Sequence, residues 1–143
     1  MAEPNPFSII ENELIDFASQ FVETKYVFIG NRPDKTADTM TQFLVVELPA
    51  EILNLTAGND DFAYRTIAVI YCYYKAKTNT TMNINGQTGL AYQVKRGFPY
   101  IAKHITATRP RVLHEGYDKN GFHVTTITFR LRTKPNAFTS NNN

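Results

Sequence analysis

Cysteine is almost absent from this chain, since Cys72 is the only one among 143 residues. A disulfide within one chain is therefore excluded, which suits a protein of a reducing compartment. Because Cys72 sits inside an apolar stretch, we interpret it as a small buried side chain rather than a reactive nucleophile. No apolar run is long enough to cross a bilayer as a helix, so we expect no membrane partner.

Neither sign of charge dominates, with 15 basic and 13 acidic residues giving a net charge of +2. This balance neither requires nor excludes a nucleic-acid partner. Apolar residues make up 43% and aromatic residues 13%, which is typical of a globular chain rather than a disordered one. The length predicts a single domain over residues 1–134, followed by a flexible polar tail over residues 135–143.

Signatures of catalysis are missing as well. The sequence has no nucleophile elbow, phosphate-binding loop or dinucleotide fingerprint. His104, His114 and His123 lack the spacing of a zinc site, although the last two lie on opposite arms of a predicted hairpin. We interpret His114 and His123 as solvated strand residues rather than as metal ligands. We therefore predict no catalytic, metal-binding or cofactor-binding residue and no enzymatic activity.

Two segments have the spacing of amphipathic helices. The first begins at Ser8, which forms a capping box with Glu11, and its apolar stripe ends near Glu23. The second stops before a Gly-Phe-Pro segment and has two candidate caps, Asn85 and Thr88.

Five strands are predicted, over residues 25–29, 42–48, 64–75, 105–115 and 122–133. The third is apolar on both faces, so we expect some of its cover to come from another subunit. The last two form a hairpin closed by a turn at residues 117–121. The order α-β-β-β-α-β-β predicts an α+β fold, with two helices packed on one face of a mostly antiparallel sheet that ends in a C-terminal β-hairpin.

Basic residues concentrate in the hairpin, at Arg109, Arg111, Arg130, Arg132 and Lys134. We expect Tyr117 and Phe122 to close the turn opposite one another. Arg109 then falls opposite Arg130, and like charges across a strand pair cost about 0.2–1 kcal/mol. An acidic counterpart would relieve this repulsion, either the acidic face of the first helix in a neighbouring copy or a phosphate backbone. The alternative is a set of hydrated arginines on an exposed strand.

The strand over residues 64–75 is rich in tyrosine. Tyr71, Tyr73 and Tyr74 have a second interpretation as a stacking platform for nucleic-acid bases, but such a platform needs basic residues between the aromatic ones. Only Arg65 and Lys75 flank the strand, at its ends, so packing in the core is favoured.

The layout as a whole resembles a known family. An amphipathic helix leads to Tyr26-Val27-Phe28-Ile29-Gly30-Asn31-Arg32-Pro33, then to Phe43-Leu44-Val45-Val46-Glu47-Leu48-Pro49, the long strand, a second helix and the hairpin. This order resembles the tail-terminator and head–tail connector (neck ring) proteins of tailed bacteriophages, including those of Bacteroides-type (crAss-like) phages. The resemblance implies six or twelve identical subunits in a ring between portal and tail, with DNA passing through the lumen without sequence readout.

The resemblance also implies which residues make contacts. The loops over residues 30–40 and 76–85 match connections that reach adjacent rings or subunits. Lumens in this family favour negative charge, so the basic hairpin is assigned to a subunit or stacking contact rather than to the channel wall. The expected contact residues are Arg32, Asp34, Lys35, Arg65, Tyr71, Tyr73, Arg109, Arg111, Arg130 and Arg132.

Together these observations predict a non-enzymatic structural protein of the virion neck or tail, made in the host cytoplasm. Its expected partners are further copies of itself, the adjacent portal, adaptor or tail ring proteins, and DNA in the lumen. The alternative function is a small α+β nucleic-acid-binding module that uses the hairpin arginines on phosphates. Salt dependence of DNA binding separates the two, because phosphate contacts weaken steeply as salt rises.

Overall fold

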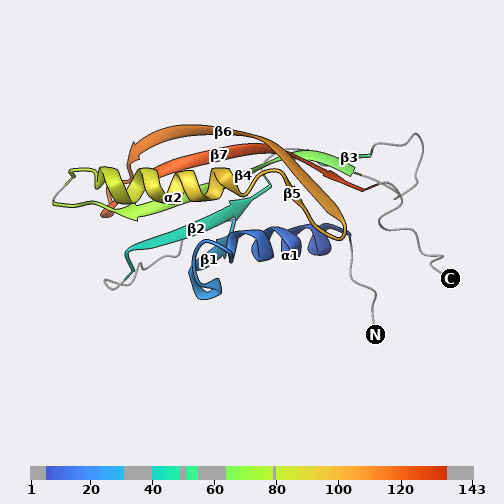
Figure 1. Cartoon of the computed structure of the whole chain (residues 1–143), viewed down its shortest axis with the longest axis horizontal. Helices are drawn as coiled ribbons and strands as arrows, with labels where there is room; N and C mark the ends of the chain where they lie inside the picture. Colours follow the sequence, from blue (N-terminus) through green and yellow to red (C-terminus); the bar gives the residue numbers. More distant parts are fainter. Residues whose placement is uncertain (1–5, 31–39, 49–50, 55–63, 79, 135–143) are drawn as a thin grey trace.

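In the computed structural model, two helices pack against one face of a twisted sheet (Figure 1). The structure describes residues 6–30, 40–48, 51–54, 64–78 and 80–134, so the predicted tail over residues 135–143 lies outside the described residues. The predicted α+β class is confirmed, as are the two helices on one face and the C-terminal hairpin.

The described residues form a seven-stranded sheet in the order β1-β2-β4-β7-β6-β5, with β3 pairing with β4 beside that path. The pair β1–β2 is parallel and the other described pairs are antiparallel. The strands are β1 (Val27–Ile29), β2 (Gln42–Glu47), β3 (Leu53–Asn54), β4 (Tyr64–Lys75), β5 (Tyr100–Ile101), β6 (Ile105–Tyr117) and β7 (Phe122–Thr133).

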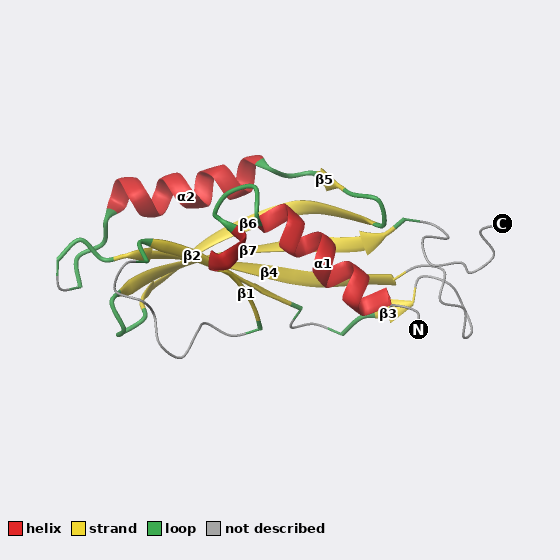
Figure 2. Cartoon of the chain, turned by 90° about the horizontal axis from the view of Figure 1, so that it is seen from below, coloured by secondary structure: helices red, strands yellow, loops and turns green. Residues whose placement is uncertain are grey.

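The helices α1 (Pro6–Ala18) and α2 (Ile84–Arg96) lie on the same face of the sheet (Figure 2). Both contribute to one apolar core, which also contains the inward-facing residues of β2, β4, β6 and β7. Phe17 of α1 is fully buried and its ring contacts those of Phe21, Phe98 and Tyr100. This aromatic group therefore joins α1 to the segment that follows α2 and stabilises the helix layer through buried ring area.

The strand β4 has the predicted bounds and two different faces. Under the helices, Ala68, Ile70 and Cys72 are fully buried, which confirms the predicted setting of the cysteine. On the opposite face Ile67 is 45% exposed, whereas Tyr73 stacks on Phe43 of β2. The described residues thus cover one face of β4 and part of the other, where the side chain of Ile67 stays exposed.

Several predicted element ends are wrong. The first helix begins at Pro6 rather than at Ser8, because proline is well suited to the first turn of a helix. It ends at Ala18, and residues 24–26 form a 3-10 turn where the sequence predicts a strand. Asn83 caps α2 by accepting a hydrogen bond from the Gly86 backbone at 3.1 Å.

The predicted alternatives, Asn85 and Thr88, lie inside α2 instead, and the Thr88 hydroxyl donates to the Ile84 carbonyl at 2.6 Å. Residues 100–101 form the short strand β5 on the edge of β6, although Ile101 has helical spacing in the sequence. The second difference reflects the pairing of the chain after α2 with β6, which the local spacing of the sequence does not contain.

Gly97, just after α2, tests the packing of the two helices. A Cβ atom there would lie 2.7 Å from the Phe21 ring and 2.8 Å from the Phe17 ring. Its φ is −70°, so the backbone accepts alanine and the cost comes from the rings alone. We expect Gly97→Ala to lower the free energy of unfolding by ~1–3 kcal/mol, measured as a lower urea midpoint at constant slope.

The matched control is Gly89→Ala in the middle of α2, where a Cβ atom meets nothing within 4 Å. We expect this change to raise the free energy of unfolding by ~0.5–1 kcal/mol, because alanine loses less conformational entropy in a helix. Equal effects of the two changes would contradict the proposed packing around Phe17.

Candidate interaction surface

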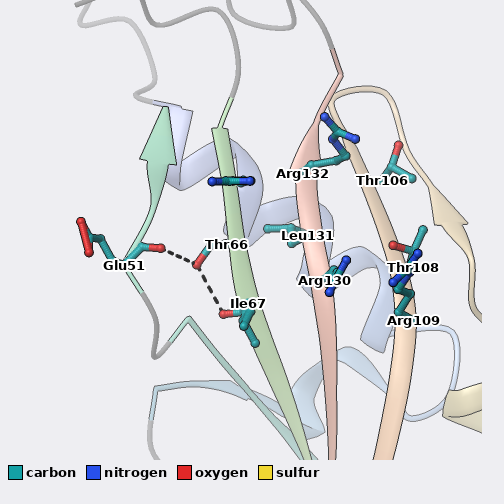
Figure 3. A pocket seen from close by; sticks show the side chains of 10 residues that line it. Glu51, Thr66, Ile67, Thr106, Thr108, Arg109, Arg130, Leu131 and Arg132 are labelled. Carbon is teal, nitrogen blue, oxygen red and sulfur yellow. Dashed lines mark hydrogen bonds between the residues drawn. The ribbon is translucent and has the colours of Figure 1, made fainter. Parts of the chain in front are cut away.

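Seven of the ten predicted contact residues lie on the sheet face opposite the helices, and five of these seven are arginines. In the register of the sheet, Arg65 of β4 pairs with Arg132 of β7, and Ile67 pairs with Arg130. Figure 3 shows the β7 arginines beside residues of β6 around one pocket. We call this surface the arginine face and define it by Arg65, Arg109, Arg111, Arg130 and Arg132.

The pairing of Arg109 with Arg130 is a wrong prediction. Tyr117 pairs with His123 rather than with Phe122, and Arg130 pairs with Thr108. A bulge shifts the register between Thr108 and Arg111, and Arg109 within it has a φ of +58°. Such a bulge adds residues to one strand of a pair, so counting from the turn places every residue beyond it incorrectly.

The like-charge pair predicted for the hairpin lies between β4 and β7 instead. Arg65 and Arg132 are cross-strand partners and both are exposed. In the described part of the chain, none of the five guanidinium groups belongs to a salt bridge. The arrangement therefore concentrates positive charge that the described residues do not neutralise.

Polar and apolar groups of the sheet complete the surface (Figure 3). One pocket is lined by Thr106 and Thr108 of β6, by Ile67 and by Glu51 at its rim. The Glu51 main-chain carbonyl accepts a hydrogen bond from the Thr66 hydroxyl at 3.0 Å. A neighbouring pocket is lined by Arg111, Pro110 and Thr128 and shares Ile67, Arg109 and Arg130 with the first. The arginine face is thus one continuous surface across β4, β7 and β6.

The two tyrosines predicted as contacts lie further along the same face. Tyr73 stacks on Phe43 with ring centroids 4.4 Å apart, and the Tyr71 hydroxyl donates to Glu47 Oε1 at 2.8 Å. Desolvation is the largest cause and this hydrogen bond the second, and together they raise the pKa of Tyr71 to about 12. Both rings are held by neighbours on β2, as the packing interpretation predicts. Arg32, Asp34 and Lys35 lie outside the described residues.

Sequence reasoning missed the threonines of the arginine face. Thr106 and Thr108 alternate with the buried residues Ile105 and Ala107, so the period-2 pattern of β6 does contain the signal. It also missed the exposure of Leu113, which only the edge position of β6 explains.

Each of the three histidines contacts another polar group of the chain, and the one cysteine is buried. His104 Nδ1 lies 2.5 Å from Glu13, His114 Nδ1 lies 2.7 Å from the Thr125 hydroxyl, and the third histidine contacts a main-chain carbonyl. Among the described residues, no group of three or more histidine, cysteine, aspartate or glutamate side chains is arranged to hold a metal ion. Burial raises the pKa of the Cys72 thiol to about 12.

Comparison with known proteins informs the fold alone. No family model matches the chain, and no curated protein matches it significantly. Eight chains of solved structures match it, and one of them has a TM-score of 0.58 at 15% identity, covering 90% of this chain and 92% of its own length. That likeness supports the α+β architecture over nearly the whole chain. Within the described residues, no helix has the length and apolarity needed to span a membrane.

The repulsion between Arg65 and Arg132 predicts a stability change. We expect Arg132→Thr to raise the free energy of unfolding by ~0.2–1 kcal/mol at low salt, because it removes a like-charge pair and introduces a good strand former. The gain is expected to shrink as added salt screens the charges. Arg111→Thr is the control, since its cross-strand partner is Thr128. A gain that is equal in both variants, or insensitive to salt, would refute the repulsion.

The burial of the Cys72 thiol predicts that it reacts slowly with thiol reagents in the native protein. Cys72 is completely buried, so we expect no reaction of the native protein with a thiol reagent at pH 8 and full reaction in denaturant. Its folded pKa lies above the ordinary value of about 8.5, so its contribution to stability is complete below that pH and falls as pH rises toward 12. The decline of unfolding free energy above pH ~8.5 is expected to be shallower in Cys72→Ala. Rapid labelling of the native protein would contradict this.

Proposed function

We propose that this chain is a non-enzymatic structural subunit that assembles head to tail into a ring in the connector or tail terminus of a tailed bacteriophage. The observation that carries the proposal is the outer edge of β6. Beyond Ala107, no described strand pairs with this edge. Between its two bulges, Val112 is 42% exposed and Leu113 is 61% exposed. A strand edge that presents unpaired backbone groups and apolar side chains is suited to pairing with another chain.

The opposite edge of the sheet supplies a different surface. There β1 is the last described strand, and its Ile29 is 42% exposed. In the sequence, the predicted contact residues Arg32, Asp34 and Lys35 follow shortly after β1, and they lie outside the described residues. Two unlike edges on one sheet favour a heterologous contact, in which the β6 edge of one copy meets the β1 edge of the next. Such contacts close into a ring where the rotation between neighbouring copies closes, and the family resemblance implies six or twelve copies.

Native mass spectrometry over a concentration series tests this assembly. We expect a discrete species of six or twelve copies in the wild-type protein and its loss in Leu113→Asp and in Ile29→Asp, because each places a charge on one edge. Tyr92→Asp is the control: its side chain is 60% exposed on α2 and belongs to neither edge strand, so the ring is expected to persist.

Mixing the two edge variants gives the sharper result. Leu113→Asp keeps an intact β1 edge and Ile29→Asp keeps an intact β6 edge, so a head-to-tail contact predicts a mixed dimer and no larger species. Absence of both the wild-type ring and the mixed dimer would overturn the head-to-tail assembly.

A further inference from the structure

The arginine face has no role in the fold that accounts for its charge. Arg65 and Arg132 repel each other across β4 and β7, and no described carboxylate forms a salt bridge with either. Arg130 and Arg111 extend the same positive surface over two further cross-strand rows. We propose that the arginine face binds the phosphate backbone of nucleic acid without reading its sequence. This adds a ligand to the proposed ring subunit and rests on the geometry of the face rather than on the ring.

The spacing of the arginines suits a polymer of phosphates. We call the line of arginines from Arg65 on β4 to Arg111 on β6 the arginine track. It crosses two strand spacings, and the β7 partners of its two ends are four residues apart. At about 4.8 Å between strands and 3.4 Å per residue, its length is about 17 Å. Nucleic-acid duplex rises by about 3.4 Å for each base pair, so the track spans about five base pairs. A single small anion would engage only one end of it.

The chemistry of the lining groups also matches phosphate. Guanidinium groups bind phosphate oxygens through paired hydrogen bonds and hold their charge at all physiological pH values. Thr106, Thr108 and Thr128 place hydroxyl donors along the same surface. Among the described residues, the arginines of this surface belong to the strands β4, β7 and β6 and none lies on a helix, so contacts to base edges in a groove are not expected.

An acidic protein surface is the competing partner, and this chain offers one on α1. Two of its carboxylates are already paired, Glu13 with His104 and, just after the helix, Glu23 with Lys25. Glu11 and Asp16 are the helix carboxylates outside those pairs. Two charges are too few to neutralise five arginines, whereas a phosphate backbone supplies one charge for each nucleotide.

Fluorescence anisotropy with a labelled random-sequence DNA duplex, titrated at several salt concentrations, tests the proposal. We expect Arg130→Gln/Arg132→Gln to weaken binding and to reduce the slope of log K against log salt by about 2, one for each lost phosphate contact. The matched control, Lys95→Gln/Arg96→Gln, makes the same charge change at the end of α2 on the opposite side of the sheet. It is expected to keep the wild-type slope, and a second duplex of unrelated sequence to bind equally well.

Three results would overturn the proposal: no binding by the wild-type protein, an unchanged slope in the arginine variant, or an equal loss in the control. Native mass spectrometry of the same samples separates the outcomes. If the arginine variant loses self-association while wild-type and variant bind DNA equally, the partner is an acidic surface of a second copy. If it loses DNA binding and keeps its ring, the arginine face and the ring contact are separate. Urea unfolding confirms that both variants are folded.

Discussion

The register between β4 and β7 is the constraint on which the rest of the molecule depends. Eleven residue pairs fix it, from Arg65 opposite Arg132 to Lys75 opposite Phe122. Because side chains alternate between sheet faces, a slip of one residue would turn the buried set outward and the arginines into the core. The same pairing therefore assembles the core under the helices and the arginine face on the other side.

The sequence predicts those parts of the fold that depend on long periodic patterns. The bounds of β4 and β7 follow from runs of β-branched and aromatic residues between polar segments, and they match the structure. Helix ends depend on single residues instead. Ser8 with Glu11 satisfies a capping box, yet Pro6 at the start of α1 is an equally good signal and the structure uses it. Local spacing cannot choose between two valid starts.

The arginine face likewise has one part that the sequence predicts and one part that it does not. The positions of the arginines in the sequence show that they gather in the hairpin, and the alternation of side chains along β7 puts Arg130 and Arg132 on one face. Their partners depend on the bulges in β6, which add residues at positions that no turn rule specifies. Arg65 joins the group only through the pairing of β4 with β7, which places it opposite Arg132, 67 positions further along the chain. Long-range register is therefore what the sequence leaves undetermined.

The two proposed contacts use different parts of the sheet, its edges and its open face, so one copy has room for both. In a ring that joins sheet edges, each copy turns one face of its sheet toward the lumen and the other outward. One face carries the helices and the other is the arginine face, and every copy turns the same face inward. If arginine faces line the lumen, DNA meets a continuous positive track. If helices line it, DNA meets α1 with Glu11 and Asp16, which is the negative lumen that the family resemblance implies. If the arginine face binds duplex DNA as proposed, the first arrangement is favoured. A face turned away from the lumen would not contact the phosphates of the DNA that passes through it.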